Sequence, residues 1–406
     1  MEEKKDLLKK LRLETTEELK NHIIPFWKKL RDPEFGGFYG YVDEDLYTDQ
    51  SYEKGCILNS RILWFFSEAY LELQDKELLD CARAAWEFLQ KAFLDEEEGG
   101  LYWSVTFDGK PLDMTKHTYN QAFAIYGISS YYKVTKDETA LELAMSLYRL
   151  IEEKMRDTEG YLEAFGRDFT PVSNEKLSEN GVSATRTMNT ILHVMEAYTS
   201  LAEVSGDESV RERLREILRI ITHRIYNQKL HRQEVFFDGD YHSLIDLSSF
   251  GHDIEAAWLI DAAAKEAYPE ANPSKEPELS AVCEMTRQLE EAVYLRAYDG
   301  HSIPNEQEKG VVKENRVWWI QAEAINGYVN AWEKQPSEEK YLEAAWNIWN
   351  YTKEYLIDKR SNGEWFWEVD REGNPIPGRA VAEPWKCPYH NGRMCLLLMR
   401  RKENAS

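Results

Sequence analysis

A segment that combines glycine with aromatic and acidic residues recurs along the whole of this chain of 406 residues. Its six copies are marked by Gly36, Gly99, Gly160, Gly239, Gly300 and Gly363. Successive markers are 61, 63 or 79 residues apart. Two helices of roughly 15 to 20 residues with a short and a longer connection fill such a length, whereas one strand and one helix need less. The repeat therefore predicts six pairs of helices.

Two kinds of helical pattern alternate between the markers. In the first, apolar residues recur at i, i+3, i+4 and i+7 and charged residues fill the other face, as in 77–93, 138–155, 209–226 and 340–357. In the second, apolar residues surround most of the helix, as in 56–73, 120–134, 185–201, 254–267 and 317–332. The first pattern is typical of outer helices and the second of helices buried on both sides. Six such pairs that close on themselves form an all-α fold, the (α/α)6 barrel.

The connections between the helices carry their own signals. Aromatic stretches near Asp-Gly or Glu-Gly pairs, such as 101–107 and 364–369, predict short β-hairpins in the connecting loops. Residues 166–186 lie in the longest interval, and we expect them to cover or line a site. No linker rich in Pro, Ser or Gly divides the chain, so we expect one domain over residues 1–406. An open solenoid is the alternative fold, but it would need polar capping repeats, which neither end shows.

The charge balance limits the partners. Acidic residues outnumber basic ones by 73 to 50, which gives a formal charge of −23. Such a chain repels phosphate backbones and anionic lipids, so we expect neither nucleic acid nor a membrane as partner. The first residues lack the apolar core of a signal peptide, and no stretch reaches the ~20 apolar residues of a membrane span. We therefore expect a cytoplasmic protein, a monomer or weak homo-oligomer, whose five scattered cysteines stay reduced.

Candidate functional residues come from the inner helices, because the sequence carries no GxGxxG after a strand, GxxxxGK[ST], HExxH or GxSxG motif. We therefore expect no cofactor and no metal. Polar residues interrupt the inner helices at comparable distances from the preceding marker, so they should gather at one end of the barrel. These residues are Arg61, His117, Asn189, His252, Trp319 and His390.

The most specific cluster is GHDIEAAW. His252, Glu255 and Trp258 are three residues apart, so a helix places them on one side. Ser248 and Ser249 are candidate starts of that helix, and a helix N-terminus disfavours imidazolium, which leaves His252 neutral and able to accept a proton. The alternative is a core histidine whose hydrogen bonds are satisfied by Glu255.

A second cluster, WKCPYHNGR, places His390 where a helix begins, with Trp385 before it and Arg393 after it. Two histidines without metal-ligand spacing favour proton transfer, because a pKa of about 6.5 suits both accepting and donating a proton. Such a base can remove the hydrogen beside the carbonyl of an open-chain sugar. Returning the proton to the opposite face epimerises that carbon, and returning it to the neighbouring carbon isomerises aldose to ketose.

Other polar residues of the inner helices are open to two interpretations. Asn189 and His193 are four residues apart on one helix face, which fits a ligand contact or a structural hydrogen bond between them. Arg61 in an apolar helix requires an ion pair or an anionic or hydroxylated ligand. The remaining candidates are Tyr119, Asn120, Trp319 and Glu323. An aromatic residue on a helix is more often part of the core than a ligand contact.

The ordered motifs SRILWFF, KHTYNQAFAIY, TMNTILH, GHDIEAAWL, RVWWIQAEA and WKCPYHNGRMC resemble the N-acylglucosamine 2-epimerase superfamily, and most closely its cellobiose 2-epimerase branch. The resemblance spans essentially the whole chain, and WKCPYH favours that branch. It implies an (α/α)6 barrel that converts the reducing-end glucose of a β-1,4-linked disaccharide to mannose without a cofactor.

The resemblance also implies roles. His390 and His252 would be the acid/base pair on opposite faces of C2, and His193 would assist ring opening or proton exchange with the carbonyl oxygen. Arg61 would stabilise the enediolate and Glu255 would orient His252. The residues expected to bind sugar are Tyr119, Asn189, Trp258, Trp319, Glu323 and Trp385.

Four alternatives are weighed against this function. N-acylglucosamine 2-epimerase and mannose isomerase belong to the same superfamily. An inverting glycoside hydrolase also fits a Trp-rich (α/α)6 barrel, but it needs two carboxylates ~6.5 to 9.5 Å apart, whereas the conspicuous residues here are histidines. A non-enzymatic scaffold would have no reason to place Arg and His inside inner helices.

Overall fold

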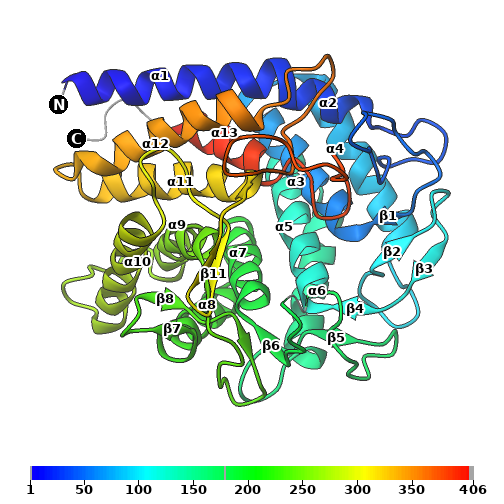
Figure 1. The fold of residues 1–406 in the computed structure, drawn as a ribbon. Helices are drawn as coiled ribbons and strands as arrows, with labels where there is room; N and C mark the ends of the chain where they lie inside the picture. Colours follow the sequence, from blue (N-terminus) through cyan, green and yellow to red (C-terminus); the bar gives the residue numbers. More distant parts are fainter. Residues whose placement is uncertain (1, 178–179, 402–406) are drawn as a thin grey trace.

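The computed structural model describes residues 2–177 and 180–401 (Figure 1). Six of the described helices form a closed inner ring. These helices are α3 (Cys56–Leu73), α5 (Thr118–Thr135), α7 (Met188–Ser205), α9 (Phe250–Ala267), α11 (Trp318–Lys334) and α13 (His390–Arg400). Each packs against the next, and α13 contacts α3 to close the ring. Their side chains are buried around most of the circumference, as the continuous apolar patterns predict.

An outer layer of helices covers the ring. It consists of α1 (Glu2–Glu18), α4 (Lys76–Phe88), α6 (Glu138–Lys154), α8 (Glu208–Ile220), α10 (Pro277–Arg296) and α12 (Glu339–Tyr351). A π-helical turn extends α1, α4, α8 and α12, namely η1 (Leu19–Ile23), η2 (Leu89–Phe93), η3 (Ile221–Ile225) and η4 (Thr352–Leu356), and α2 (Ile24–Lys29) follows η1.

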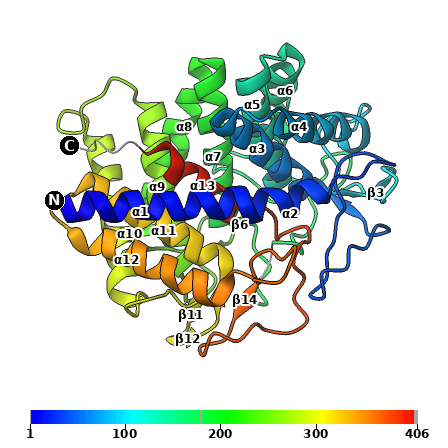
Figure 2. The same cartoon turned by 90° about the horizontal axis from the view of Figure 1, so that it is seen from above.

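The first outer helix belongs to the last inner helix. Helix α1 lies along α13 and beside α12 (Figure 2), so the two ends of the chain complete one pair. The predicted (α/α)6 barrel is therefore confirmed, and the open solenoid is excluded because the last repeat packs on the first.

The same tight turn joins inner to outer helix in three repeats. Helices α3, α5 and α7 end at a residue in the left-handed conformation, and the next residue, an aspartate, caps the following helix. The side chains of Asp75, Asp137 and Asp207 each accept a hydrogen bond from the backbone N–H two residues later. Inner and outer helices are thereby held antiparallel.

Short strands tie successive repeats together at the other end of the helices. The strand before an inner helix pairs with the loop strand of the next repeat: β1 (Lys54–Gly55) with β2 (Ser104–Val105), β4 (Lys116–His117) with β5 (Ala164–Phe165), β6 (Arg186–Thr187) with β9 (Phe236–Phe237), β10 (Leu247–Ser249) with β11 (Glu306–Glu308), and β13 (Arg316–Val317) with β14 (Glu368–Val369). A bridge between Val42 and Ala382 makes the sixth connection.

The hairpin predicted at 101–107 is present, because strand β2 pairs locally with β3 (Pro111–Asp113). Two further hairpins lie outside the predicted segments: β11 pairs with β12 (Val311–Lys313), and β7 (Tyr226–Asn227) pairs with β8 (Arg232–Gln233). Single bridges close the other loops, such as Phe165 with Pro171 and Val369 with Pro375. The pairing between repeats is the part that local sequence does not reveal.

The structure corrects one marker of the repeat. In every repeat a side-chain oxygen at the start of the loop accepts a hydrogen bond from the N–H two residues later, at Asp32, Asp95, Asp157, Asn227, Asp299 and Asp358. The fourth turn therefore begins at Asn227, whereas Gly239 lies further along, in the hairpin turn after β9. The turn at Asn227 contains His231 at φ 48°, so it has no glycine for a sequence pattern to detect.

Ion pairs connect four of these turns to the inner helices, and two of them, Lys54–Asp32 and Lys116–Asp95, are buried. A basic residue in the strand before the helix reaches the aspartate of the turn: Lys54 to Asp32 (2.6 Å), Lys116 to Asp95 (2.9 Å), Arg186 to Asp157 (2.6 Å) and Arg316 to Asp299 (2.6 Å). Together these contacts fix the loop end of the barrel, where the inner helices begin. None of the helices that the structure describes has both the length and the apolar character that a bilayer crossing requires.

Candidate active site

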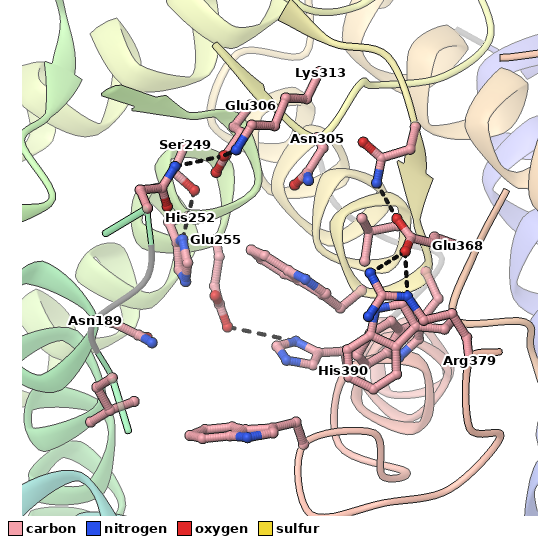
Figure 3. A pocket seen from close by; sticks show the side chains of 18 of the residues that line it. Asn189, Ser249, His252, Glu255, Asn305, Glu306, Lys313, Glu368, Arg379 and His390 are labelled. Atoms are coloured by element: carbon pink, nitrogen blue, oxygen red, sulfur yellow. Dashed lines mark hydrogen bonds and ion pairs between the residues drawn. The ribbon is translucent and has the colours of Figure 1, made fainter. Parts of the chain in front are cut away.

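A cavity of about 590 Å³ opens at the loop end of the inner ring (Figure 3). Nine of the eleven predicted site residues line it: Arg61, Tyr119, Asn189, His193, His252, Glu255, Trp319, Trp385 and His390. Most stand in the first two turns of inner helices, as expected from their similar distances to the markers. His117 is buried against Trp103 and is not among the lining residues.

His390 begins α13, and its Nδ1 lies 2.8 Å from Oε1 of Glu323 on α11. Both oxygens of Glu323 are contacted by donors, since Arg393 Nη2 approaches Oε1 at 2.7 Å and Trp258 Nε1 approaches Oε2 at 3.0 Å. Glu323 therefore acts as an acceptor, so Nδ1 carries the proton and Nε2 of His390 is the free ring nitrogen. Burial is the main cause that lowers the pKa of His390 well below its ordinary value, and the positive charge of Arg393 is the second. Both keep the imidazole neutral.

His252 has a different partner from the predicted one. Its Nδ1 lies 2.7 Å from Oγ of Ser249, which precedes α9, and not beside Glu255. Burial, followed by His193, lowers the pKa of His252 to about 3. The predicted neutral imidazole is therefore supported, although burial is the main cause and a helix N-terminus is not needed.

Glu255 turns toward the other histidine. Its Oε1 accepts a hydrogen bond from Arg393 Nη2 at 2.5 Å and lies 3.8 Å from His390 Nδ1. The expectation that Glu255 orients His252 is therefore wrong: the i, i+3 spacing gave the right helix, but ring closure brings Arg393 of α13 to the carboxylate. Burial and the neighbouring Glu323 raise the pKa of Glu255. Its Oε2 has no hydrogen-bond partner among the described residues.

Glu255, Glu323 and His390 come close enough together to hold a cation. The guanidinium of Arg393, however, already donates to Oε1 of both carboxylates, at 2.5 and 2.7 Å. A metal ion at this point would have to displace that buried charge. The geometry is therefore that of a guanidinium clamp.

His193 and Asn189 on α7 do not form the structural pair that was one interpretation of their spacing. His193 Nδ1 lies 2.8 Å from Oε2 of Glu196, one turn further along the same helix. Asn189 lines the cavity with a buried Oδ1 that has no hydrogen-bond partner among the described residues (Figure 3). An unsatisfied amide in a cavity is suited to contact a hydroxylated ligand.

Arg61 lines the cavity. Among the described residues, no carboxylate contacts its guanidinium. Its Nη2 donates to the hydroxyl of Tyr119 at 2.8 Å, and its guanidinium lies over the ring of Phe123 at 4.0 Å. Nη1 reaches the carbonyl of Trp385 at 3.4 Å, and the buried Nε has no hydrogen-bond partner in the part of the chain that the structure describes. Of the two predicted options, an ion pair or an oxygen ligand, the structure leaves room for the ligand.

Two predicted sugar contacts, Trp258 and Glu323, are not among the residues that line the cavity. Trp258 donates from Nε1 to Oε2 of Glu323 behind the wall. Trp258 lies one turn beyond Glu255 along α9, which carries it away from the loop end. Both residues support the site residues from behind and do not face the cavity.

The rim contains residues that the sequence analysis missed. Asn305, Glu306, Lys313 and Asn315 come from the β11–β12 hairpin and its flanks, Trp367, Glu368 and Arg379 from the last loop, and Trp318 from α11. The predicted excursion does line the site, through Leu177 and Asn180. Asn180 Nδ2 donates to Glu306 and Glu308 at 3.1 Å, which joins this excursion to the hairpin across the rim.

Known proteins similar to this chain place it in a family. The family profile described as N-acylglucosamine 2-epimerase (GlcNAc 2-epimerase) matches residues 36–391. The chain belongs to this family. It is 48% identical to a cellobiose 2-epimerase of Eubacterium cellulosolvens, over 94% of this chain and 96% of the relative, and 46% identical to one of Ruminococcus albus, over 96% and 98%.

A solved structure of the family supports the same placement. The cellobiose 2-epimerase of Bacillus thermoamylovorans superposes with a TM-score of 0.92 at 42% identity, covering 97% of this chain and all of that one. The resemblance stated from the sequence motifs is therefore confirmed at the level of the N-acylglucosamine 2-epimerase family and of the barrel.

Proposed function

We propose that the protein is a cellobiose 2-epimerase, which inverts C2 of the reducing-end glucose of β-1,4-linked disaccharides, as in cellobiose to 4-O-β-D-glucosyl-D-mannose or lactose to epilactose. The observation that carries this proposal is a cavity lined by His252 and His390, both neutral, beside Arg61, which has no carboxylate partner there. High identity to cellobiose 2-epimerases along nearly the whole chain supports it.

The proposed reaction needs side chains alone. His193 assists opening of the sugar ring, and one of His252 and His390 removes the C2 proton through its free nitrogen. The enediolate that forms carries negative charge, which the Arg61 guanidinium stabilises. The other histidine returns a proton to the opposite face of C2.

Trp319 is placed to present the sugar to both bases. Its ring centroid lies 4.8 Å from that of His252 and 5.3 Å from that of His390. A sugar ring that stacks on this indole would lie between the two histidines. We propose that four residues contact the sugar: Trp319, Trp385, Tyr119 and Asn189. Glu255, Glu323 and Trp258 hold the imidazole of His390 in place.

An inverting hydrolase is disfavoured by how the carboxylates are used. Glu255 and Glu323 are held by Arg393, and on the rim Glu306 pairs with Lys313 and Glu368 with Arg379. No two carboxylates of the described cavity are therefore free to serve as acid and base. N-acylglucosamine epimerisation and mannose isomerisation remain the alternatives within the family.

The proposal also covers the domain organisation, the cellular location and the oligomeric state of the enzyme. We propose that residues 1–406 act as one catalytic domain, in the cytoplasm, as a monomer or weak homo-oligomer without cofactor. The charge of −23 supports the absence of nucleic-acid and anionic-membrane partners.

One sugar panel tests the function. The protein is incubated in heavy water with cellobiose, lactose, mannose and N-acetylglucosamine, each with and without a chelator, and the products are separated by chromatography. The expected result is the glucosyl-mannose and epilactose products with one deuteron at C2, no free glucose and no effect of chelator. Free glucose would indicate a hydrolase, and turnover of only mannose or N-acetylglucosamine would select a rival within the family.

A further inference from the structure

A second cavity lies on the far side of the residues that hold the site histidines. Its volume is about 190 Å³, and its walls come from α3, α5, α7, α9 and α13, toward the C-terminal ends of these inner helices. Trp64, Tyr126 and Ser200 form part of its wall. We call it the rear cavity, because the candidate active site opens at the other end of the same helices.

Glu196 separates the two cavities. It lines the rear cavity, while His193, to which it bonds, lines the front one. Oε2 of Glu196 accepts hydrogen bonds from His193 Nδ1 at 2.8 Å and from the Tyr389 hydroxyl at 2.5 Å, and Oε1 accepts from Arg393. One buried carboxylate therefore links the rear cavity to a histidine of the site.

The contacts of Glu196 define what it does for His193. Burial alone would raise the pKa of Glu196, but Arg393 and His193 lower it to about 2, so the group is a carboxylate. A carboxylate accepts only, so it keeps the proton of His193 on Nδ1 and leaves Nε2 as the free nitrogen. It also stabilises the imidazolium that forms when His193 takes up a proton, as an orienting carboxylate does for a catalytic histidine.

The charges that line the rear cavity are balanced. Arg400 and Lys133 are paired with Glu68 and with Glu203 respectively, and Arg393 is paired with Glu196. An anion that took the place of the Glu196 carboxylate would meet the donors of Arg393, Tyr389 and His193 already arranged.

We propose that Glu196 is the positioning residue of His193, and that the rear cavity is the route by which a small carboxylate reaches this position, once the Glu196 side chain is removed, while sugar fills the front cavity. The proposal rests on the proposed function, because it assigns a role to a histidine of that site.

Chemical rescue tests the proposal. In Glu196→Ala we expect kcat for cellobiose to fall at least about tenfold, because His193 loses the partner that fixes its proton. Formate, which restores a carboxylate in the vacated space, should raise kcat several-fold, whereas the bulkier pivalate should not. A lost hydrophobic or structural contact would not respond to formate, so a folded Glu196→Ala protein that formate does not activate would overturn the positioning role.

The route of entry is tested separately. If formate enters from the rear, saturating cellobiose leaves the rescue intact; suppression of rescue by cellobiose would mean entry from the front and would overturn the rear route. Ser200→Leu narrows the rear cavity and should abolish rescue in the Glu196→Ala background without changing the otherwise wild-type enzyme. Ser205→Leu, at the end of the same helix and outside the lining residues, is the matched control and should leave rescue unchanged.

A folding defect would not hide the answer. If Glu196→Ala does not fold, the isosteric Glu196→Gln is measured, and we expect a lower kcat with a cellobiose KM near that of wild type. Unchanged kcat in Glu196→Gln would contradict the positioning role. Failure of the proposed function is distinguishable, because the wild-type protein itself would then show no epimerisation of cellobiose.

Discussion

Ser249 Oγ lies 2.7 Å from Nδ1 of His252, in the position that a carboxylate occupies at the other two histidines of the cavity. Glu323 fills that position at His390 and Glu196 at His193, each at 2.8 Å. A carboxylate stabilises the imidazolium, whereas a hydroxyl, which both donates and accepts, favours neither charge state. The two proposed bases are therefore built unequally.

Replacing Ser249 by Asp should reduce this inequality. The new carboxylate would stabilise the protonated form of His252, so the pKa of His252 should rise from about 3 toward its ordinary value. The measurement is an NMR titration of the His252 Cε1–H resonance. Ser249→Ala serves as the control, since it removes the hydroxyl without adding charge, and an equal rise in both variants would refute the explanation.

The two-base assignment makes a distinct prediction for His390→Asn and His252→Asn. Each replacement removes a base but keeps much of the shape, so epimerisation should fall beyond the ~10²- to 10⁴-fold typical of one acid–base contribution, because the bases act in sequence. A variant that retains one base should still exchange the C2 proton of the epimer that faces it.

Deuterium exchange into the gluco and manno disaccharides, measured separately, distinguishes the two bases. Each variant should exchange one epimer and not the other. If both variants exchange both epimers at wild-type rates, or if either keeps full epimerase activity, a single mobile base or another residue such as His193 must act instead.

The barrel could be predicted from the sequence because its loop segments and its apolar residues recur at regular intervals. Mostly apolar stretches such as 56–73 form inner helices, and Arg61, His252 and His390 stand out because charged and ionisable side chains are rare there. Helical spacing predicts which residues share a face of one helix, but it does not predict which residues of other helices contact that face once the ring closes. Glu255 was therefore assigned to His252, although its partner Arg393 is 138 residues away.

Rim residues were missed for a different reason. Lys313 and Glu368 lie in loop strands of two or three residues, where a charged side chain looks like any solvated one. Strand β14, which holds Glu368, pairs with the preceding repeat directly, and the strand of Lys313 does so through β11 of the same hairpin. This pairing carries both residues to the mouth of the cavity. The aspartates and asparagine that begin each loop were a more regular signal than glycine, and they would have located the fourth repeat at Asn227.

Arg393→Met tests the buried clamp as a structural element. Arg393 is 1% exposed and donates to Glu196, Glu255 and Glu323, so its removal leaves buried carboxylates without their counter-charge. Breaking such a cluster typically costs about 3–5 kcal/mol in the free energy of unfolding. Urea unfolding should show this loss, while Arg287→Met, which removes a half-exposed pair with Glu284, should stay within about 0.5 kcal/mol. Equal effects would refute the clamp.

The stability of the barrel should depend on pH through His117. This imidazole is 2% exposed, and burial, followed by Lys176, lowers its pKa to about 4. Between about pH 6.5 and pH 4 the unfolded chain binds a proton at this side chain and the folded protein does not, so its contribution to stability is present above pH 6.5 and is lost as the pH falls. The slope is about 1.4 kcal/mol per pH unit within that window.

Buried carboxyl groups act in the opposite direction, so the test is a difference between two proteins. Burial raises the pKa of Glu163 and of Asp253 to about 7, which means that the folded protein binds their protons more readily than the unfolded chain and gains stability as the pH falls. His117→Phe keeps a ring beside Trp103 but removes the titrating group. The free energy of unfolding, measured in urea at pH 7.5 and pH 5, should fall more in wild type than in His117→Phe. Equal pH dependence of the two proteins would show that His117 does not stay neutral in the fold.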